Sequence, residues 1–164
     1  MDQALTQLSG LVGTACRQHQ LMIATAESCT GGWAAQVITH TAGSSAWFER
    51  GFVTYSNTAK IDMLGVNSVT LERFGAVSVE TALEMANGAL THSRAQIALA
   101  ITGIAGPGGG SPGKPVGTVC FAWSIKNQTA QAEQQVFAGD RESVRRQAVI
   151  RALEGVLSRI KEMN

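Results

Sequence analysis

The sequence is short of the residues from which many hydrolases are built. It has three histidines and three aspartates among 164 residues, and the histidines share no common spacing. A metal hydrolase or a Ser-His-Asp triad would have to draw on this short set. The three cysteines show no C-x-x-C spacing, which indicates neither a disulfide framework nor a zinc site. We therefore expect no metal.

Excess charge and long apolar runs are also missing. Thirteen Lys and Arg against twelve Asp and Glu leave a net charge of +1, which argues against a protein that holds nucleic acid by broad electrostatics. No run approaches the roughly 18 apolar residues of a membrane span. The first ten residues show neither the basic start nor the apolar stretch of a secretion signal. We expect a cytoplasmic protein with no membrane or nucleic-acid partner.

Glycine is the residue that the sequence has in excess. There are 18 glycines but only 3 prolines, against a usual glycine content of about 7%. Residues 103–115 hold six of these glycines and all three prolines. No other stretch resembles a linker, and no internal repeat is visible. The chain length fits one ordinary domain spanning residues 1–164.

Hydrophobic periodicity predicts alternating helices and strands. Helical spacing occurs in residues 2–20, 33–40, 57–64, 68–74, 78–94 and 141–163. Apolar or β-rich runs occur in residues 21–26, 51–56, 96–102, 117–125 and 129–137, the last two as an antiparallel pair. Helix caps are expected at Asn57, Ser68, Ser78 and Asp140, with Gly65 as a stop signal. This order predicts a three-layer α/β/α sandwich with a mixed, mostly parallel sheet.

The first candidate site is the segment 27–32, which lies between a predicted strand and a predicted helix. Ligands of α/β proteins bind outside the carboxyl ends of strands, and a helix N-terminus offers free N–H groups to an anion or oxyanion. Ser28 or Cys29 could act as a nucleophile, and Gly31 and Gly32 let a ligand approach the backbone. Taken alone, the segment slightly favours a structural role, in which Ser28 and Thr30 cap the helix and the glycines turn the chain.

The second candidate is Tyr55 with Lys60. Tyr55 is the single tyrosine of the chain and ends a predicted strand, and Lys60 follows in the first turn of a helix. A desolvated lysine can be neutral near pH 7 and serve as general base to a serine. A tyrosine can relay the proton or hold the geometry. On their own, these residues also fit a solvated lysine and a half-buried core tyrosine.

Two further segments could contact a ligand. Thr102 and Gly103 end another predicted strand and open the glycine-rich loop, which lacks the Gly-Lys-Ser/Thr ending of a P-loop. Arg141 and Arg145 lie one turn apart at the start of the last helix, where they would suit a phosphate or carboxylate. A flexible surface loop and surface ion pairs remain the alternative interpretations of these segments.

Together, four segments resemble the CinA C-terminal domain family, and more closely its stand-alone deamidases of nicotinamide mononucleotide. These segments are AESCTGG, GFVTYSNTAK, ITGIAGPGGG with KPVGTV, and GDR with VRRQA. The resemblance covers essentially the whole chain. It implies hydrolysis of nicotinamide mononucleotide to nicotinic acid mononucleotide and ammonia, without a metal or cofactor, which returns pyridine nucleotide to NAD synthesis.

The resemblance also implies roles for individual residues. Ser28 would be the nucleophile, Lys60 its activating base and Tyr55 a support for proton transfer. The residues expected to bind the substrate or its oxyanion are Glu27, Thr30, Gly31, Gly32, Thr102, Gly103 and Arg141. The sequence leaves open the individual roles of the arginines at 141, 145 and 146, and whether Cys29 contributes.

Two other functions stay open at this level. The same loops could hold a nucleotide without turnover, or the chain could be an interaction module linked to competence or DNA damage. Ammonia release, or its absence, separates the first alternative from an amidohydrolase, and salt-dependent DNA binding would favour the second. We expect a homodimer, the commonest assembly of soluble proteins.

Overall fold

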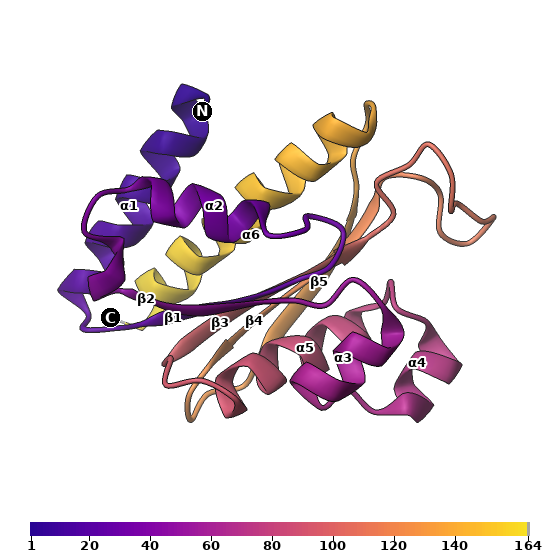
Figure 1. The fold of residues 1–164 in the computed structure, drawn as a ribbon, viewed down its shortest axis with the longest axis horizontal. Coiled ribbons are helices and arrows are strands. Elements are labelled where there is room, and N and C mark those ends of the chain that lie inside the picture. Colours follow the sequence, from indigo (N-terminus) through magenta and orange to yellow (C-terminus); the bar gives the residue numbers. More distant parts are fainter. Residues whose placement is uncertain (164) are drawn as a thin grey trace.

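The computed structural model describes residues 1–163 and resembles the predicted architecture closely (Figure 1). Six α-helices are present in this part of the chain: α1 (Gln3–Gln18), α2 (Trp33–His40), α3 (Asn57–Leu64), α4 (Ser68–Phe74), α5 (Val79–Thr91) and α6 (Arg141–Glu162). The strands are β1 (Ile23–Glu27), β2 (Phe48–Val53), β3 (Ile97–Gly103), β4 (Thr118–Ile125) and β5 (Gln131–Val136), and a short 3₁₀ turn, η1 (Ser44–Ala46), precedes β2.

The strands form one mixed sheet in the order β2-β1-β3-β4-β5. β1 pairs in parallel with both β2 and β3, whereas β4 is antiparallel to both β3 and β5. Four strands therefore run in one direction and β4 alone is reversed, which confirms the mixed, mostly parallel sheet. The carboxyl ends of β1, β2 and β3 consequently meet at one edge of the sheet.

Helices cover both faces of this sheet, as expected for a three-layer sandwich. Figure 1 shows α1, α2 and α6 on one face and α3, α4 and α5 on the other. The chain leaves β1 toward the first face and leaves β2 toward the second. The carboxyl end of β1 thus borders a topological switch point, the position at which open α/β sheets bind ligands.

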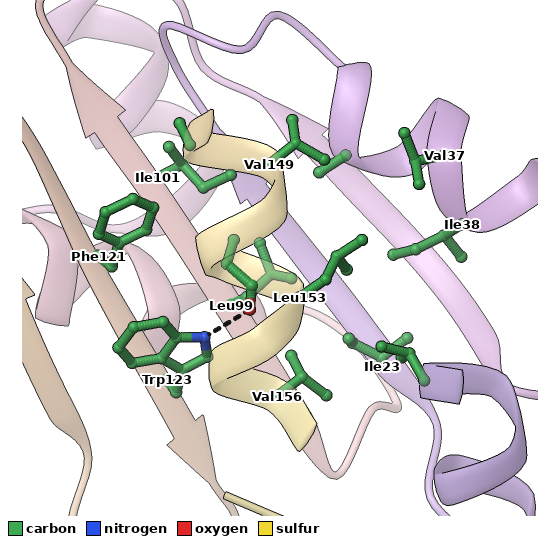
Figure 2. Close-up of a cluster of buried hydrophobic side chains, with 14 of the residues drawn as sticks. Ile23, Val37, Ile38, Leu99, Ile101, Phe121, Trp123, Val149, Leu153 and Val156 are labelled. Atoms are coloured by element: carbon green, nitrogen blue, oxygen red, sulfur yellow. Dashed lines mark hydrogen bonds between the residues drawn. The ribbon is translucent and has the colours of Figure 1, made fainter. Parts of the chain in front are cut away.

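The two faces of the sheet carry side chains of different size. Large apolar residues pack under α1, α2 and α6 (Figure 2), where the Trp123 indole N–H donates to the Ala152 carbonyl of α6 at 2.8 Å. The opposite face presents small buried residues beneath α5, namely Ala24, Ala26, Ala98, Ala100, Cys120 and Ala122. Alternating size along each strand therefore distinguishes the two cores, and the small side chains let α5 approach the sheet closely.

The largest difference from the sequence prediction concerns β2. It begins at Phe48, three residues before the predicted start at residue 51, and ends at Val53. Phe48 and Arg50 pair with Ile23 and Ala24 of β1, and the register shifts between these two pairs, at Glu49. Pairing between distant segments, rather than local propensity, determines where this edge strand starts.

Two predicted caps were wrong by one residue. Ser56 caps α3 by accepting from the Ala59 N–H at 3.0 Å, and Asn67 caps α4 by accepting from the Val69 N–H at 2.8 Å. Caps at Ser78 and Asp140 and the left-handed Gly65 that ends α3 are confirmed. In the two wrong cases neighbouring residues are both good cap formers, so composition does not separate them.

Candidate active site

Ser28 and Lys60 meet at the carboxyl end of β1. Lys60 Nζ lies 3.0 Å from Ser28 Oγ, a hydrogen-bond distance, and donates to the Thr54 carbonyl oxygen at 2.9 Å. Ser28 is half-buried, directly after β1, and Lys60 is in the first turn of α3. Two segments that the sequence placed at strand ends are thus brought together as a serine–lysine pair.

Lys60 is held in an unusual environment for a lysine. Its side chain is only 2% exposed, and within residues 1–163 it makes no ion pair with a carboxylate. Burial lowers the pKa of Lys60 because the charged ammonium loses its hydration. A neutral amine at hydrogen-bond distance from a serine hydroxyl is the arrangement that a serine–lysine nucleophile requires.

Backbone contacts hold the lysine in place. The Thr54 N–H donates to the Glu27 carbonyl at 2.8 Å, which keeps the chain after β2 beside the end of β1. The cap at Ser56 then starts α3 at once. Because Lys60 follows within one turn of this cap, its side chain returns to the strand ends.

Glu27 and Thr30 were expected among the substrate-binding residues, but their side chains are fully buried and hydrogen-bond within the protein. The Thr30 hydroxyl donates to Glu27 Oε1 at 2.6 Å. The Glu27 carboxylate also accepts from the Ala34 and Ala35 N–H groups at 2.9 and 3.0 Å. The carboxylate therefore satisfies the first turn of α2. We revise the role of both side chains from substrate contact to positioning of the nucleophile segment.

The backbone after Ser28 offers unused hydrogen-bond donors. Within the described part of the chain, the N–H groups of Cys29, Thr30 and Gly32 have no protein acceptor. The Gly31 N–H, expected to be a third donor, instead donates to the Ser28 carbonyl at 3.0 Å. Gly31 and Gly32 have φ values of 59° and 101°, which glycine adopts without strain. Free N–H groups beside a nucleophile can bind a developing oxyanion.

Cys29 does not have the properties of a nucleophile in this fold. Its side chain is 6% exposed, and burial raises the pKa of its thiol to about 12. The thiolate, which is the reactive form, is therefore disfavoured at neutral pH. Between the two nucleophiles that the sequence left open, the geometry favours Ser28.

Tyr55 and Arg141 form a second polar pair near this edge. Arg141 donates from Nη2 to the Tyr55 hydroxyl at 2.9 Å and from Nη1 to the Gly106 carbonyl at 2.8 Å. The Tyr55 side chain is 61% exposed, and in the described residues its hydroxyl makes no hydrogen bond to Ser28 or Lys60. The expected proton relay through Tyr55 is therefore not formed by direct contact here.

Thr102 and Gly103 support the edge from β3. The Thr102 hydroxyl, expected to face a ligand, is 1% exposed and donates to the Ala76 carbonyl at 2.8 Å. A Cβ at Gly103 would lie 2.9 Å from the Thr118 carbonyl oxygen, so close strand packing alone explains this glycine. We accordingly revise Thr102 to a residue that holds the segment before α5 against the sheet.

The three arginines at the start of α6 have different hydrogen-bond partners. Arg145 donates to the carbonyl oxygens of Cys29 and Thr30 at 3.0 and 3.2 Å, whereas Arg146 pairs with Asp2 at 2.8 Å. Arg141 and Arg145, which the sequence suggested as a joint anion site, therefore hydrogen-bond to different groups in this structure. Sequence reasoning missed the contacts of Arg145, and the only signal was the unusual cluster of cations at a helix N-terminus.

The size of a hollow does not identify this site. A hollow of about 360 Å³ lies between α5 and the β4–β5 turn, at the opposite edge, and includes neither Ser28 nor Lys60. No group of three metal-ligating side chains occurs within residues 1–163, and no helix there is long and apolar enough to cross a membrane. The chemistry of the side chains therefore locates the site on an open edge of the sheet.

Comparisons with known proteins identify the family of the chain. A model of the CinA C-terminal domain matches residues 5–160. Nicotinamide-nucleotide amidohydrolase PncC of Escherichia coli (strain K12) is 56% identical over 153 residues, which cover 93% of each chain. PncC of Pseudomonas putida is 50% identical over 153 residues, which cover 93% of this chain and 95% of that protein.

A solved structure shows the same fold. The competence/damage inducible protein CihA from Agrobacterium tumefaciens is 48% identical, with a TM-score of 0.94 over 96% of both chains. A match over nearly the whole length, in sequence and in structure, leaves no segment of the fold unexplained. The chain belongs to the CinA C-terminal domain family.

Proposed function

We propose that the chain is a nicotinamide-nucleotide amidohydrolase that converts nicotinamide mononucleotide and water to nicotinic acid mononucleotide and ammonia. Relatives named for this activity are 50–56% identical to it over 93% of its length. The observation that carries the mechanism is the buried lysine at 3.0 Å from Ser28 Oγ. A neutral lysine at this distance can supply the base that a serine nucleophile needs.

Neutral Lys60 starts the reaction by taking the proton of Ser28. The serine oxygen attacks the carboxamide carbon and forms a tetrahedral intermediate, while the proton moves to Lys60 Nζ. The pyridinium ring of the substrate withdraws electrons from the amide and makes its carbon easier to attack. The Thr54 carbonyl, which accepts from Lys60 Nζ at 2.9 Å, stabilises the ammonium form that results.

The Thr30 and Gly32 N–H groups are the oxyanion donors in this mechanism. Both lack a protein acceptor within residues 1–163 and lie within four residues of the nucleophile. One well-placed donor of this kind stabilises the transition state by roughly 3–4 kcal/mol. Gly31 contributes differently, because its N–H is used to close the turn at Ser28.

Lys60 then returns its proton to the leaving nitrogen, and the carbon–nitrogen bond breaks to release ammonia and leave an ester on Ser28. In the second half, Lys60 takes a proton from water, and hydroxide attacks the ester carbon. Collapse of this intermediate breaks the bond to Ser28, whose oxygen recovers the proton from Lys60. The enzyme is restored with no other reactant consumed.

Tyr55 and Arg141 are placed to bind the nucleotide portion in this proposal. The guanidinium keeps further N–H groups beside its contacts to Tyr55 and Gly106, and a fork of donors suits a 5′-phosphate. The exposed Tyr55 ring offers a flat surface at the same edge. Tyr55 in this arrangement acts on the position of the substrate through Arg141.

Ammonia release by the purified chain tests the activity, with nicotinamide mononucleotide, its riboside and free nicotinamide as substrates. Ser28→Ala should lower kcat by roughly a thousandfold or more, whereas Cys29→Ala should stay within about fivefold of the parent. The opposite pattern would assign the nucleophile to Cys29. Binding of the mononucleotide without ammonia release would instead favour a binding module, and salt-dependent binding of duplex DNA an interaction role.

The expected homodimer belongs to the same proposal. A single protomer leaves Tyr55 and the neighbouring Val53 exposed beside the site. Light scattering coupled to gel filtration measures the mass directly. A mass near 17.2 kDa, that of one chain, would exclude the dimer and leave catalysis to the isolated protomer.

A further inference from the structure

Arg145 makes its contacts with the nucleophile segment through main-chain oxygens alone. It lies near the start of α6, 116 residues from Cys29, and donates from Nε to the Cys29 carbonyl at 3.0 Å. Its Nη2 donates to the Thr30 carbonyl at 3.2 Å, and its guanidinium carbon lies 5.4 Å from the centre of the Trp33 ring. Arg145 takes no part in the reaction steps proposed for Ser28 and Lys60.

Peptide planarity converts these two contacts into control of N–H groups. In a trans peptide, the C=O of one residue and the N–H of the next lie in one plane and point in opposite directions. Fixing the Cys29 carbonyl therefore fixes the Thr30 N–H, which is free to bind an oxyanion. Fixing the Thr30 carbonyl likewise fixes the Gly31 N–H, which donates to the Ser28 carbonyl.

The charge of Arg145 acts in the same direction. Arg146 pairs with Asp2, but Arg145 makes no ion pair within the described part of the chain. A guanidinium on a carbonyl oxygen draws electron density through the peptide and strengthens the N–H of that peptide as a donor. Trp33, itself in the first turn of α2, holds the guanidinium from its ring face.

We propose that Arg145 is a positioning residue that fixes and polarises the Cys29–Thr30 peptide and thereby prepares the Thr30 N–H to stabilise the oxyanion formed at Ser28. The inference rests on the proposed amidohydrolase function for its substrate, but the peptide geometry is independent of which carbonyl compound reacts. An interaction realised mainly in the transition state affects kcat more than KM. Direct binding of the substrate phosphate by Arg145 would instead raise KM.

Steady-state kinetics of Arg145→Met and Arg145→Lys with nicotinamide mononucleotide test this proposal. We expect Arg145→Met to lower kcat roughly ten- to hundredfold with KM within about threefold. Arg145→Lys keeps the cation and one donor, so its kcat should be intermediate. The matched control is Arg146→Met, the next residue, whose partner is the exposed Asp2; its kcat should match that of the parent.

A kcat of Arg145→Met within twofold of the parent overturns the proposal, and so does a loss that appears only in KM. If the thermal melt shows that Arg145→Met does not fold, the kcat and KM of Arg145→Lys are compared with those of the parent instead. The rate at which a small fluorophosphonate labels Ser28 provides a second readout, because that reaction also develops charge on an oxygen at this position. Labelling should slow in both variants.

The second readout separates the two proposals. If the parent chain releases no ammonia but Arg145→Met is labelled more slowly than the parent, the proposed function fails and the role of Arg145 stands. If the parent releases ammonia and labelling is equally fast in all variants, the function stands and the role of Arg145 is wrong.

Discussion

At the scale of single residues, the proposed mechanism depends on a lysine that is uncharged when it takes the proton of Ser28. Lys60 is buried, has no carboxylate partner within residues 1–163, and its amine hydrogen-bonds to the neutral oxygens of Ser28 and Thr54. Burial disfavours the ammonium, so the pKa of Lys60 lies below the 10.5 of an ordinary lysine. Burial of Lys60 lowers the free energy of unfolding at low pH, where the buried amine must carry a charge. The same burial makes the amine available as a base.

The pH dependence of the rate follows from this direction. The amine is protonated and inactive below its pKa, so kcat/KM should rise by about tenfold per pH unit until the pH passes that pKa. The midpoint should lie below 10.5 because the pKa is lowered. The rate should be measured above pH 7, because the substrate phosphate itself changes its charge at about pH 6.

Lys60→Met is the variant that checks this assignment. The variant lacks the amine, so the rise of kcat/KM with pH should disappear together with most of the activity. Lys126→Met, the control, changes an exposed lysine in the β4–β5 turn. It should keep both the rate of the parent and the rise of kcat/KM with pH. An unchanged pH profile in Lys60→Met would exclude the lysine as the base.

Tyr55→Phe separates a proton relay from a binding role. Because the Tyr55 hydroxyl accepts a hydrogen bond from Arg141, its loss should raise KM by roughly fivefold, the equivalent of about 1 kcal/mol. The value of kcat and the pH profile should change little. A large fall in kcat with a shifted profile would restore the relay that the family resemblance implied.

Some of these residue roles could be predicted from the sequence and others could not. Ser28 and Lys60 each follow a predicted strand, and parallel strands bring such positions to one edge. The contacts of Glu27 and Arg145, by contrast, are made to backbone N–H and carbonyl groups. The direction of a peptide group depends on local φ and ψ and leaves no residue pattern behind it.

At the scale of elements, helices and strands were predicted more accurately than their contacts. Apolar spacing marked all six helices of the described chain, and end residues such as Asp140 and Gly65 fixed several limits. The edge strand β2 was displaced because its start depends on pairing with β1. Elements whose limits follow from local caps are therefore accessible to sequence reasoning, and those fixed by a partner strand are not.

The contact between α3 and α5 gives a prediction at this scale. A Cβ at Gly88 would overlap the Leu64 carbonyl at the end of α3, so Gly88→Ala should lower the free energy of unfolding by about 1–3 kcal/mol. Gly10 lies in α1 with nothing within 4 Å of an added Cβ. Gly10→Ala should therefore raise the free energy of unfolding by about 0.5–1 kcal/mol.

Urea unfolding of the two alanine variants measures both changes. Because α3 carries Lys60, displacement of this helix by Gly88→Ala should also reduce kcat, while Gly10→Ala leaves it unchanged. Equal stability of both variants would mean that α3 and α5 separate without cost, contrary to their tight contact in the fold.

At the scale of the whole molecule, the site is assembled from segments far apart in the chain. Ser28 and Lys60 are 32 residues apart, and Tyr55 and Arg141 are 86 residues apart. The sheet makes this possible because its parallel strands end at one edge, to which the start of α6 brings Arg141 and Arg145. The net charge of +1 therefore conceals a local concentration of cations beside the nucleophile.

That local charge predicts how the molecule distinguishes its substrates. If Arg141 binds the 5′-phosphate, Arg141→Ala should lower kcat/KM for nicotinamide mononucleotide by roughly 10- to 100-fold, because charge-assisted hydrogen bonds are lost. The riboside lacks the phosphate, so its kcat/KM should change little. Arg17→Ala, at the end of α1, is the control with the same change of charge. An equal loss on both substrates would mean that Arg141 acts by holding Tyr55 and the Gly106 loop, and the phosphate would then need another partner.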